Sequence, residues 1–195
     1  MLQDVSIGKN VTSIRDYSFN SCHSLASITI PDGVTSINSY AFQNCYSLAS
    51  ITIPDGVTSV DAYSFAKCYS LASITIPDGV TSIDYDDFYY CYSLASITIP
   101  DGVTSINSYA FQNCYSLASI TIPDGVTSIG DSAFYNCYGM RYYDFSACTA
   151  IPALSNTSAF RDIPSDCQML IPSALYNNWK TATNWATYAS KMVSV

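Results

Sequence analysis

The stretch from Pro31 to Ile53 reads PDGVTSINSYAFQNCYSLASITI, and the stretch from Pro100 to Ile122 repeats it letter for letter. Outward from these two copies, the same 23-residue unit recurs six times in tandem and covers residues 8–145. Its phase is marked by equally spaced cysteines: Cys22, Cys45, Cys68, Cys91, Cys114 and Cys137. A fixed period of this length is typical of a solenoid, in which each unit forms one coil and stacks on its neighbours.

Each unit combines two short extended segments with one compact turn. In SLASITIP (residues 24–31), apolar residues alternate with small polar ones, which predicts a short half-buried strand that ends at a Pro-Asp-Gly turn. VTSI (residues 34–37) predicts a second extended piece with its two apolar side chains inward. AFQNC (residues 41–45) has the spacing of a single helical or 3₁₀ turn. One unit buries too little apolar surface to fold alone, so neighbouring coils must stabilise one another.

Composition narrows the possible functions. The chain has 195 residues, of which 49% are hydrophobic and 11% charged, so it can build a core and is not intrinsically disordered. A net charge of −8 with scattered cations argues against a nucleic-acid-binding surface, and no apolar run is long enough for membrane insertion. The single histidine, His23, and the lack of a nucleophile–base set or phosphate loop argue against an enzyme and against a bound cofactor.

The pattern L-x-x-I-x-I-P-x-x-V-x-x-I-x-x-x-A-F-x-x-C resembles the BspA-like leucine-rich repeat, and the match extends from Leu2 to about Phe145. The resemblance implies a right-handed solenoid with a parallel β-sheet on its concave face. It also implies a short strand and a 3₁₀ or helical turn on the other side, and a helical cap at the C-terminus. Proteins of this family are mostly surface or secreted proteins that attach to host or microbial partners.

The sequence divides into two parts. Residues 1–145 hold the leucine-rich repeats, with LQDVSI (residues 2–7) as the last strand of a truncated first unit followed by six copies. Residues 146–195 hold an irregular last repeat, stretched to 26 residues, and a C-terminal cap. Helical spacing after the last repeat predicts one or two amphipathic helices with a break at Asn184, formed around Leu175, Trp179, Ala182, Trp185, Tyr188 and Met192.

The N-terminal coil has no comparable cap, so we expect an open edge of the parallel sheet there. Either the chain is part of a longer array, or this edge pairs with another copy of the chain. The opening residues MLQDVSIGKN have neither the basic nor the apolar segment of a signal peptide.

The cysteine column is interpreted as a column of structural thiols that fill the core. Neighbouring coils are close enough for a disulfide, but side chains in register point the same way, and pairing would make near-identical coils inequivalent. No two cysteines have the close spacing of a zinc site. Cys148 and Cys167 lie outside the column, and a disulfide between them is an open alternative.

Two further columns are interpreted as structural. The aspartates of the Pro-Asp-Gly turns are ordinary turn residues, with Ca²⁺ binding as the weaker alternative. The Ser-x-Thr strip of the strands suits a pleated face, with ice binding as the weaker alternative. The aspartates are Asp32, Asp55, Asp78, Asp101 and Asp124, and the threonines are Thr29, Thr52, Thr75, Thr98 and Thr121.

Tyrosine is in excess, with 17 residues. The segment LASITIPDGVTSI hardly changes between copies, whereas the segment before each cysteine varies, and in the fourth copy it holds Tyr85, Asp86, Asp87, Tyr89 and Tyr90. Tyrosine offers a large amphipathic contact area at low entropy cost, which favours interfaces. We therefore predict a partner-binding face of Tyr40, Tyr46, Tyr63, Tyr69, Tyr85, Tyr89, Tyr90, Tyr92, Tyr109 and Tyr115. The alternative is that these rings only pack on one another along the ladder.

These observations predict a non-enzymatic binding or adhesion module whose partner is a protein or a glycan. The alternative is a structural repeat protein that assembles end to end through its N-terminal edge. We expect no metal, no cofactor and no nucleic acid. The family resemblance favours the cell surface, the extracellular space or a phage virion as its location.

Overall fold

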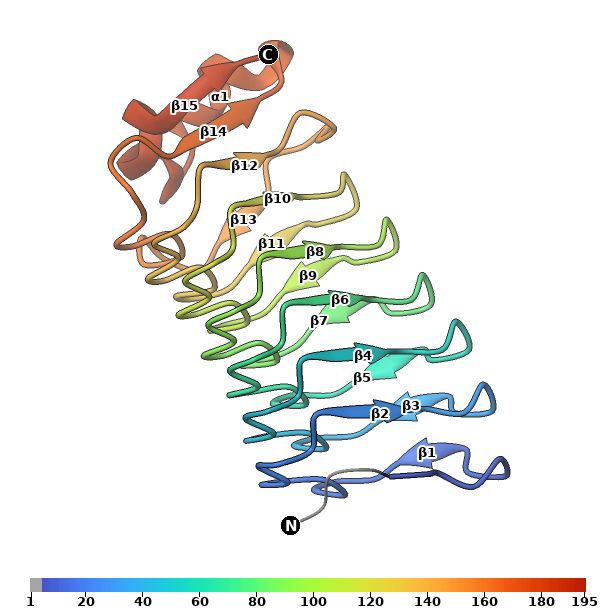
Figure 1. Ribbon diagram of the computed structural model, residues 1–195. Helices are drawn as coiled ribbons and strands as arrows, with labels where there is room; N and C mark the ends of the chain where they lie inside the picture. Colours follow the sequence, from blue (N-terminus) through green and yellow to red (C-terminus); the bar gives the residue numbers. More distant parts are fainter. Residues whose placement is uncertain (1–4) are drawn as a thin grey trace.

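The computed structural model describes residues 5–195, which form one stack of parallel coils (Figure 1). Each regular coil contributes a three-residue strand to a first sheet column and a two-residue strand to a second. The first column consists of β2 (Ser27–Thr29), β4 (Ser50–Thr52), β6 (Ser73–Thr75), β8 (Ser96–Thr98), β10 (Ser119–Thr121), β12 (Tyr142–Asp144), β14 (Gln168–Ile171) and β15 (Met192–Ser194). The second consists of β1 (Ser13–Ile14), β3 (Ser36–Ile37), β5 (Ser59–Val60), β7 (Ser82–Ile83), β9 (Ser105–Ile106), β11 (Ser128–Ile129) and β13 (Ala153–Leu154).

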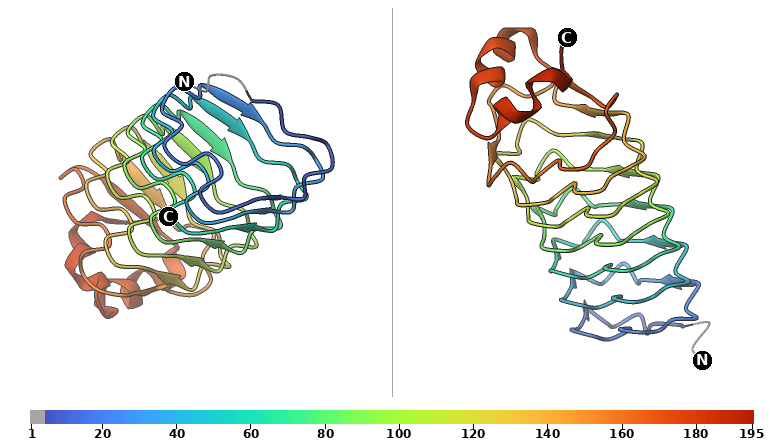
Figure 2. Two further views of the ribbon diagram at one scale, coloured as in Figure 1. Left: turned by 90° about the horizontal axis from the view of Figure 1, so that it is seen from below. Right: turned by 90° about the vertical axis from the view of Figure 1, so that its left-hand side faces the viewer.

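Strands of neighbouring coils pair in parallel, with like residues opposite one another. Ile28 lies opposite Ile51 in the first column, and Ser13 lies opposite Ser36 in the second. One coil is therefore one 23-residue unit, and the predicted solenoid is confirmed. Its coils lie one behind another when they are seen from below (Figure 2). The strand ladders are interrupted between β8 and β10 in the first column, and between β5 and β7 in the second.

The segment before each cysteine forms a third hydrogen-bonded face. In place of the expected helical or 3₁₀ turn, it contains consecutive turns, because two residues of each coil have a positive φ. In one coil these are Tyr40 and Asn44, both with a φ of 61°. A left-handed residue ends a helical run. The backbone N–H of Phe42 instead donates to the carbonyl of Ser64 in the following coil at 2.8 Å.

Columns of equivalent apolar side chains form the core. From the second copy onward, the leucine, phenylalanine and cysteine columns are fully buried in the regular coils. Their phenyl rings stack in register with centroids 5.2–5.8 Å apart. Gly125 allows its coil to approach the preceding one closely, since a Cβ added there would lie 2.8 Å from the carbonyl oxygen of Asp101.

The C-terminal end of the stack is covered by short helices and one more strand (Figures 1 and 2). Tyr142 pairs with Gln168, which confirms the 26-residue step of the last repeat. The helices that follow are η1 (Ser173–Leu175), α1 (Tyr176–Thr181) and η2 (Trp185–Lys191). The predicted break at Asn184 is confirmed by its φ of 65°.

Met192 departs from the prediction, because it begins β15 instead of extending the second helix. β15 pairs in parallel with β14, with Met169 opposite Met192. The free edge of β14 has backbone donors and acceptors that a strand satisfies and a helix does not. The cap therefore adds a strand as well as a helical cover.

At the other end, the truncated first unit begins the stack. Ser6 forms a parallel bridge with Thr29, and Val5 and Ile7 pack half-buried against the core. This agrees with the assignment of LQDVSI to an earlier coil. Leu2, the first apolar residue of that segment, lies outside the described residues.

Candidate binding face

The structure places the cysteine column inside the solenoid as free thiols. Cys22 is half-buried, and the other five are fully buried. Each buried thiol donates to the carbonyl oxygen of a phenylalanine in the preceding coil, over 3.1–3.3 Å. Desolvation by burial raises the pKa of Cys45 to about 12 and that of Cys68 well above its usual value. These groups are protonated core side chains, not nucleophiles.

Cys148 and Cys167 are also free thiols, so the structure does not contain the alternative disulfide between them. The Cys148 thiol points to the carbonyl of Ile122, and the Cys167 thiol to its neighbour Gln168, at 3.7 and 3.8 Å. Burial raises the pKa of both thiols to about 11.

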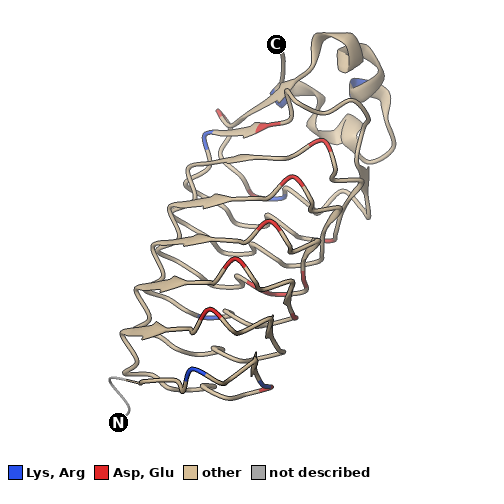
Figure 3. Ribbon diagram, turned by 90° about the vertical axis from the view of Figure 1, so that its right-hand side faces the viewer, with Lys and Arg blue, Asp and Glu red and all other residues tan. Residues whose placement is uncertain are grey.

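The aspartates of the Pro-Asp-Gly turns lie in an exposed row along one edge of the first sheet column (Figure 3). At the C-terminal end of the row, Asp124 accepts hydrogen bonds from the backbone N–H of Thr149 at 2.6 Å and from its hydroxyl at 2.8 Å. These bonds lower the pKa of Asp124. Within residues 5–195, no group of three or more His, Cys or Asp side chains is placed to hold a metal ion.

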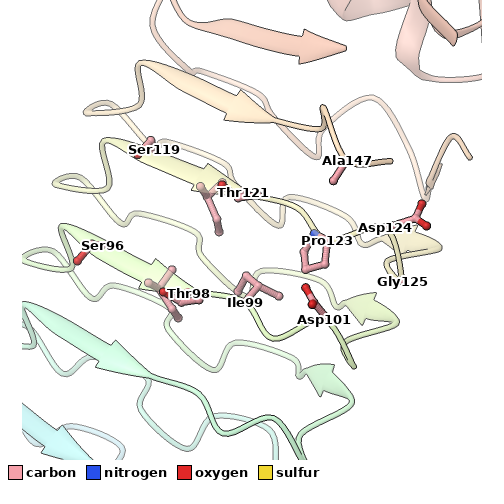
Figure 4. A pocket seen from close by; sticks show the side chains of 12 residues that line it. Ser96, Thr98, Ile99, Asp101, Ser119, Thr121, Pro123, Asp124, Gly125 and Ala147 are labelled. Atoms are coloured by element: carbon pink, nitrogen blue, oxygen red, sulfur yellow. The ribbon is translucent and has the colours of Figure 1, made fainter. Parts of the chain in front are cut away.

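Beside this row, the outer face of β8 and β10 forms an open groove of about 710 Å³ (Figure 4). Its floor carries small hydroxyl side chains, including Thr98 and Thr121, and Asp101 and Asp124 lie at its edge. The groove lining contains no histidine, cysteine or amine.

One row of aromatic rings follows the cysteine column, and we call it the post-cysteine row. Neighbouring rings are stacked, with interplanar angles of 2–28° and centroids 4.5–5.4 Å apart. Each inner ring covers the faces of its neighbours, so the row presents ring edges and hydroxyls at the surface. The row consists of His23, Tyr46, Tyr69, Tyr92, Tyr115 and Tyr138.

A second row, which we call the turn row, consists of tyrosines at the first positive-φ position of the first, second, third and fifth copies; Ser132 stands there in the sixth. Tyr17 stacks on Tyr40, and Tyr40 on Tyr63, both with centroids 4.7 Å apart. The next coil places Asp86 there, with a φ of 57°, and the coil after it places Tyr109, with a φ of 62°. In the described part of the chain, no ring contact joins Tyr63 to Tyr109.

The fourth copy (residues 77–99) adds three tyrosines that belong to neither row. Tyr85 is 51% exposed. Tyr89 contacts Tyr90 edge to face at 4.2 Å, and Tyr90 contacts Tyr92 of the post-cysteine row at 5.4 Å. Of the tyrosines predicted from the sequence, most therefore lie in two stacked rows, and Tyr89 and Tyr90 contact the post-cysteine row through Tyr92.

The sequence prediction missed two buried carboxylates in the same copy. Asp86 is 8% exposed and Asp87 is 1% exposed. Asp87 stands where Ala41 stands in an earlier copy, and its carboxylate accepts the backbone N–H of Asp84 at 2.8 Å. In the preceding coil, the equivalent N–H of Asp61 donates to a strand carbonyl. The substitution of aspartate for alanine thus coincides with the interruption of the strand ladder between β5 and β7. Aligning the copies of the repeat would have shown the substitution.

Comparisons with known proteins were made for the sequence and for the fold. Residues 1–91 and 81–182 match the BspA type leucine-rich repeat region, with six copies. No curated protein matches the chain. Within the described residues, no helix has the length and apolar character to cross a membrane.

Solved structures of bacterial leucine-rich repeat proteins share the fold. A leucine-rich cell surface protein of Faecalibacterium prausnitzii is 33% identical, with a TM-score of 0.69 over 88% of this chain and 55% of its own. This chain therefore spans about half the length of that protein. A leucine-rich repeat protein of T. pallidum is 30% identical, with a TM-score of 0.67 over 76% of this chain and 78% of its own. By its repeat motif, its coil geometry and these relatives, the chain belongs to the BspA-type leucine-rich repeat family.

Proposed function

We propose that this chain is a non-enzymatic binding module that presents its two aromatic rows to a macromolecular partner. The observation that carries the proposal is the fourth copy, where the repeat departs most from its consensus and where Tyr89 and Tyr90 extend the post-cysteine row through edge-to-face contacts. Apart from Asp87, the core and strand residues of the regular coils stay nearly constant between copies, which is what a scaffold requires. Variation at the turns changes the surface at little cost to the fold.

The ring geometry favours a protein partner over a glycan. Sugar rings are commonly recognised on the open faces of aromatic side chains, and most faces in the post-cysteine row are covered by the next ring. Ring edges and hydroxyls remain, and these suit hydrogen bonding and side-chain packing at a protein interface. The F. prausnitzii relative is described as a cell surface protein, which supports the same location for this chain.

The test is a binding screen against matrix proteins and glycans with the unmodified chain and a variant that combines Tyr85→Ala, Tyr89→Ala and Tyr90→Ala. A second variant, Tyr135→Ala with Tyr142→Ala, removes tyrosines outside the predicted face as a matched control. We expect at least tenfold weaker binding for the first variant and little change for the second. Equal binding by all three proteins, with unchanged circular dichroism, would remove this face from consideration.

Self-association is the second proposal, and one observation favours it. Phe19 and Cys22 are half-buried, whereas their equivalents Phe42 and Cys45 are fully buried. A second copy, or further coils of a longer array, would cover these column ends. Light scattering over a concentration series tests the first possibility, because an association through this edge must increase the apparent mass with concentration.

A further inference from the structure

The post-cysteine row ends at Tyr138, and this last ring has one open face. Tyr115 of the preceding coil stacks on the other face, with centroids 5.4 Å apart. Over residues 5–195, Tyr138 has no second ring contact, and its side chain is 56% exposed compared with 38% for Tyr115. The Tyr138 hydroxyl donates to the side-chain oxygen of Asn136 at 3.0 Å, which orients the ring. The end of the row therefore presents a flat apolar face on the side of the following coil.

A surface pocket of about 360 Å³ lies on that side of the ring. The sixth copy and the last repeat line it with Tyr138, Gly139, Met140, Arg141, Pro164 and Asp166. Small-ligand pockets have volumes of about 300–1,000 Å³, so this one has the size for a small ligand or one unit of a larger one.

The lining residues depart from the regular repeat. Gly139 replaces a serine, Ser116 in the preceding copy, and a Cβ at Gly139 would lie 2.4 Å from the carbonyl oxygen of Tyr115. Arg141 replaces an alanine, Ala118 in the preceding copy. The backbone N–H of Arg141 still donates to the carbonyl of Ala118 at 2.8 Å, so the strand ladder is kept and a cationic side chain is added to it.

The two charged residues of the pocket are not paired with each other. Both are exposed, and the ion pair formed within the described residues is that of Arg161 with Asp162. The Lys191 Nζ donates to the carbonyl of Pro164 at 2.7 Å, which holds the loop before Asp166 against the cap. The guanidinium N–H groups of Arg141 and the carboxylate oxygens of Asp166 therefore remain available to a ligand.

An open aromatic face beside separate donors and acceptors matches the chemistry of a sugar. A pyranose ring has C–H groups that pack on an aromatic face, and hydroxyls at its rim that both donate and accept hydrogen bonds. An anionic ligand would meet the carboxylate of Asp166, and a cationic one the guanidinium of Arg141. We infer that the pocket beside Tyr138 is a binding site for one neutral pyranose unit of a glycan.

This site goes beyond the proposed function, which concerns a protein partner at the fourth copy. The inner rings of the post-cysteine row have covered faces, which argues against a glycan along the row. Tyr138 is the ring at which that argument does not hold, because no further ring follows it.

The experiment titrates the full chain with methyl β-D-galactopyranoside, followed by the ring signals of Tyr138 in NMR spectra. The axial 4-hydroxyl of this sugar leaves one ring face apolar. D-sorbitol is the control ligand, because it carries hydroxyls on an open chain without a rigid face. We expect the galactoside to shift the Tyr138 signals and to bind about tenfold more tightly than sorbitol. Equal binding of the two ligands, or no binding of the galactoside, would overturn the inference.

Two variants test the ring face. Tyr138→Ala removes the face and is expected to weaken galactoside binding about tenfold, whereas Tyr138→Phe keeps the face and is expected to retain most of the binding. Tyr17→Ala is the matched control, since Tyr17 is an equally exposed ring, at 57%, at the N-terminal end of the turn row. Binding that survives Tyr138→Ala would show that the sugar does not stack on this ring.

Arg141→Ala tests the polar side of the pocket independently of the ring. Alanine is the residue of the regular coils at this position, so the variant is expected to fold, and galactoside binding is expected to weaken several-fold. Unchanged binding would remove Arg141 from the site and contradict the inferred pocket. If the galactoside does not bind, but a protein partner still depends on Tyr85, Tyr89 and Tyr90, this inference fails and the proposed function stands.

Discussion

Asp87 shows how one side chain alters a repeat that is otherwise regular. Its equivalents Ala41, Ala110 and Ala133 are buried and apolar, whereas Asp87 buries a carboxyl group in the same column. The backbone N–H groups of Asp84 and Ser64 donate to it, which recovers part of the lost hydration. Desolvation still dominates and raises its pKa well above the usual range. The residue therefore makes the stability of the whole protein depend on pH.

We expect Asp87→Ala to stabilise the protein near pH 7 by about 1–3 kcal/mol. Because the folded-state pKa of Asp87 is raised, the native protein retains a proton that the unfolded chain releases above about pH 4. This term destabilises the native state as pH rises from about 4 through the folded-state pKa. Urea unfolding across this pH range measures it, with Asp87→Asn as the uncharged, similarly sized control. A stability gain that is the same at acidic and neutral pH would show that charge burial is not the cause.

The fold could be predicted from the sequence because each apolar position recurs in phase with the cysteines. Ile28 and Ile51 could be placed opposite one another before any coordinates, since one period is one coil. The replacement of a turn-row tyrosine by Asp86 could also be predicted by aligning the copies, but spacing alone does not show that the tyrosine rings of this row stack on one another. The burial of Asp86 could not be predicted from the sequence, because it depends on how the tyrosines around it pack.

The turn segments were harder to predict than the strands. AFQNC has helical spacing, but the structure places a positive-φ residue on either side of its phenylalanine. What stabilises this conformation is non-local: the N–H groups of the turn donate to the following coil, as Lys67 does to the carbonyl of Tyr89. The segment has asparagine at the second positive-φ position in some coils, including Asn44 and Asn113, and asparagine tolerates that conformation.

Lys67 occupies this second position with a φ of 61°. We expect Lys67→Asn to raise the free energy of unfolding by about 0.5–1 kcal/mol, because asparagine adopts positive φ at lower cost than lysine. The backbone hydrogen bond to Tyr89 is retained in the variant. Lys67→Ala removes the same charged chain but keeps a side chain that disfavours positive φ, so thermal or urea unfolding should show no comparable gain. An equal gain in both variants would assign the effect to loss of the lysine side chain.

A stack of coils is stabilised by contacts between nearest neighbours, so each open end is the place where unfolding starts. The C-terminal end is closed by Trp179 and Trp185, which are buried against each other and against the last phenyl rings. The indole N–H of Trp185 donates to the carbonyl of Pro152 at 2.7 Å, which ties the cap to the last repeat. The cap therefore protects the columns that would otherwise end in solvent.

Trp185→Phe tests how far this protection extends along the molecule. The variant keeps an aromatic ring but leaves the Pro152 carbonyl without its donor, which costs about 1–3 kcal/mol. In a nearest-neighbour stack the effect of this loss is local. Amide hydrogen exchange should therefore accelerate most in β13 and β14, and the acceleration should become smaller toward β7 and β3. Tyr176→Phe, which removes a hydroxyl contact to Met192 from a half-buried ring, is the control and should accelerate exchange less. Equal acceleration in every coil would mean that the solenoid unfolds as one cooperative unit, and that the cap stabilises β3 as much as β14.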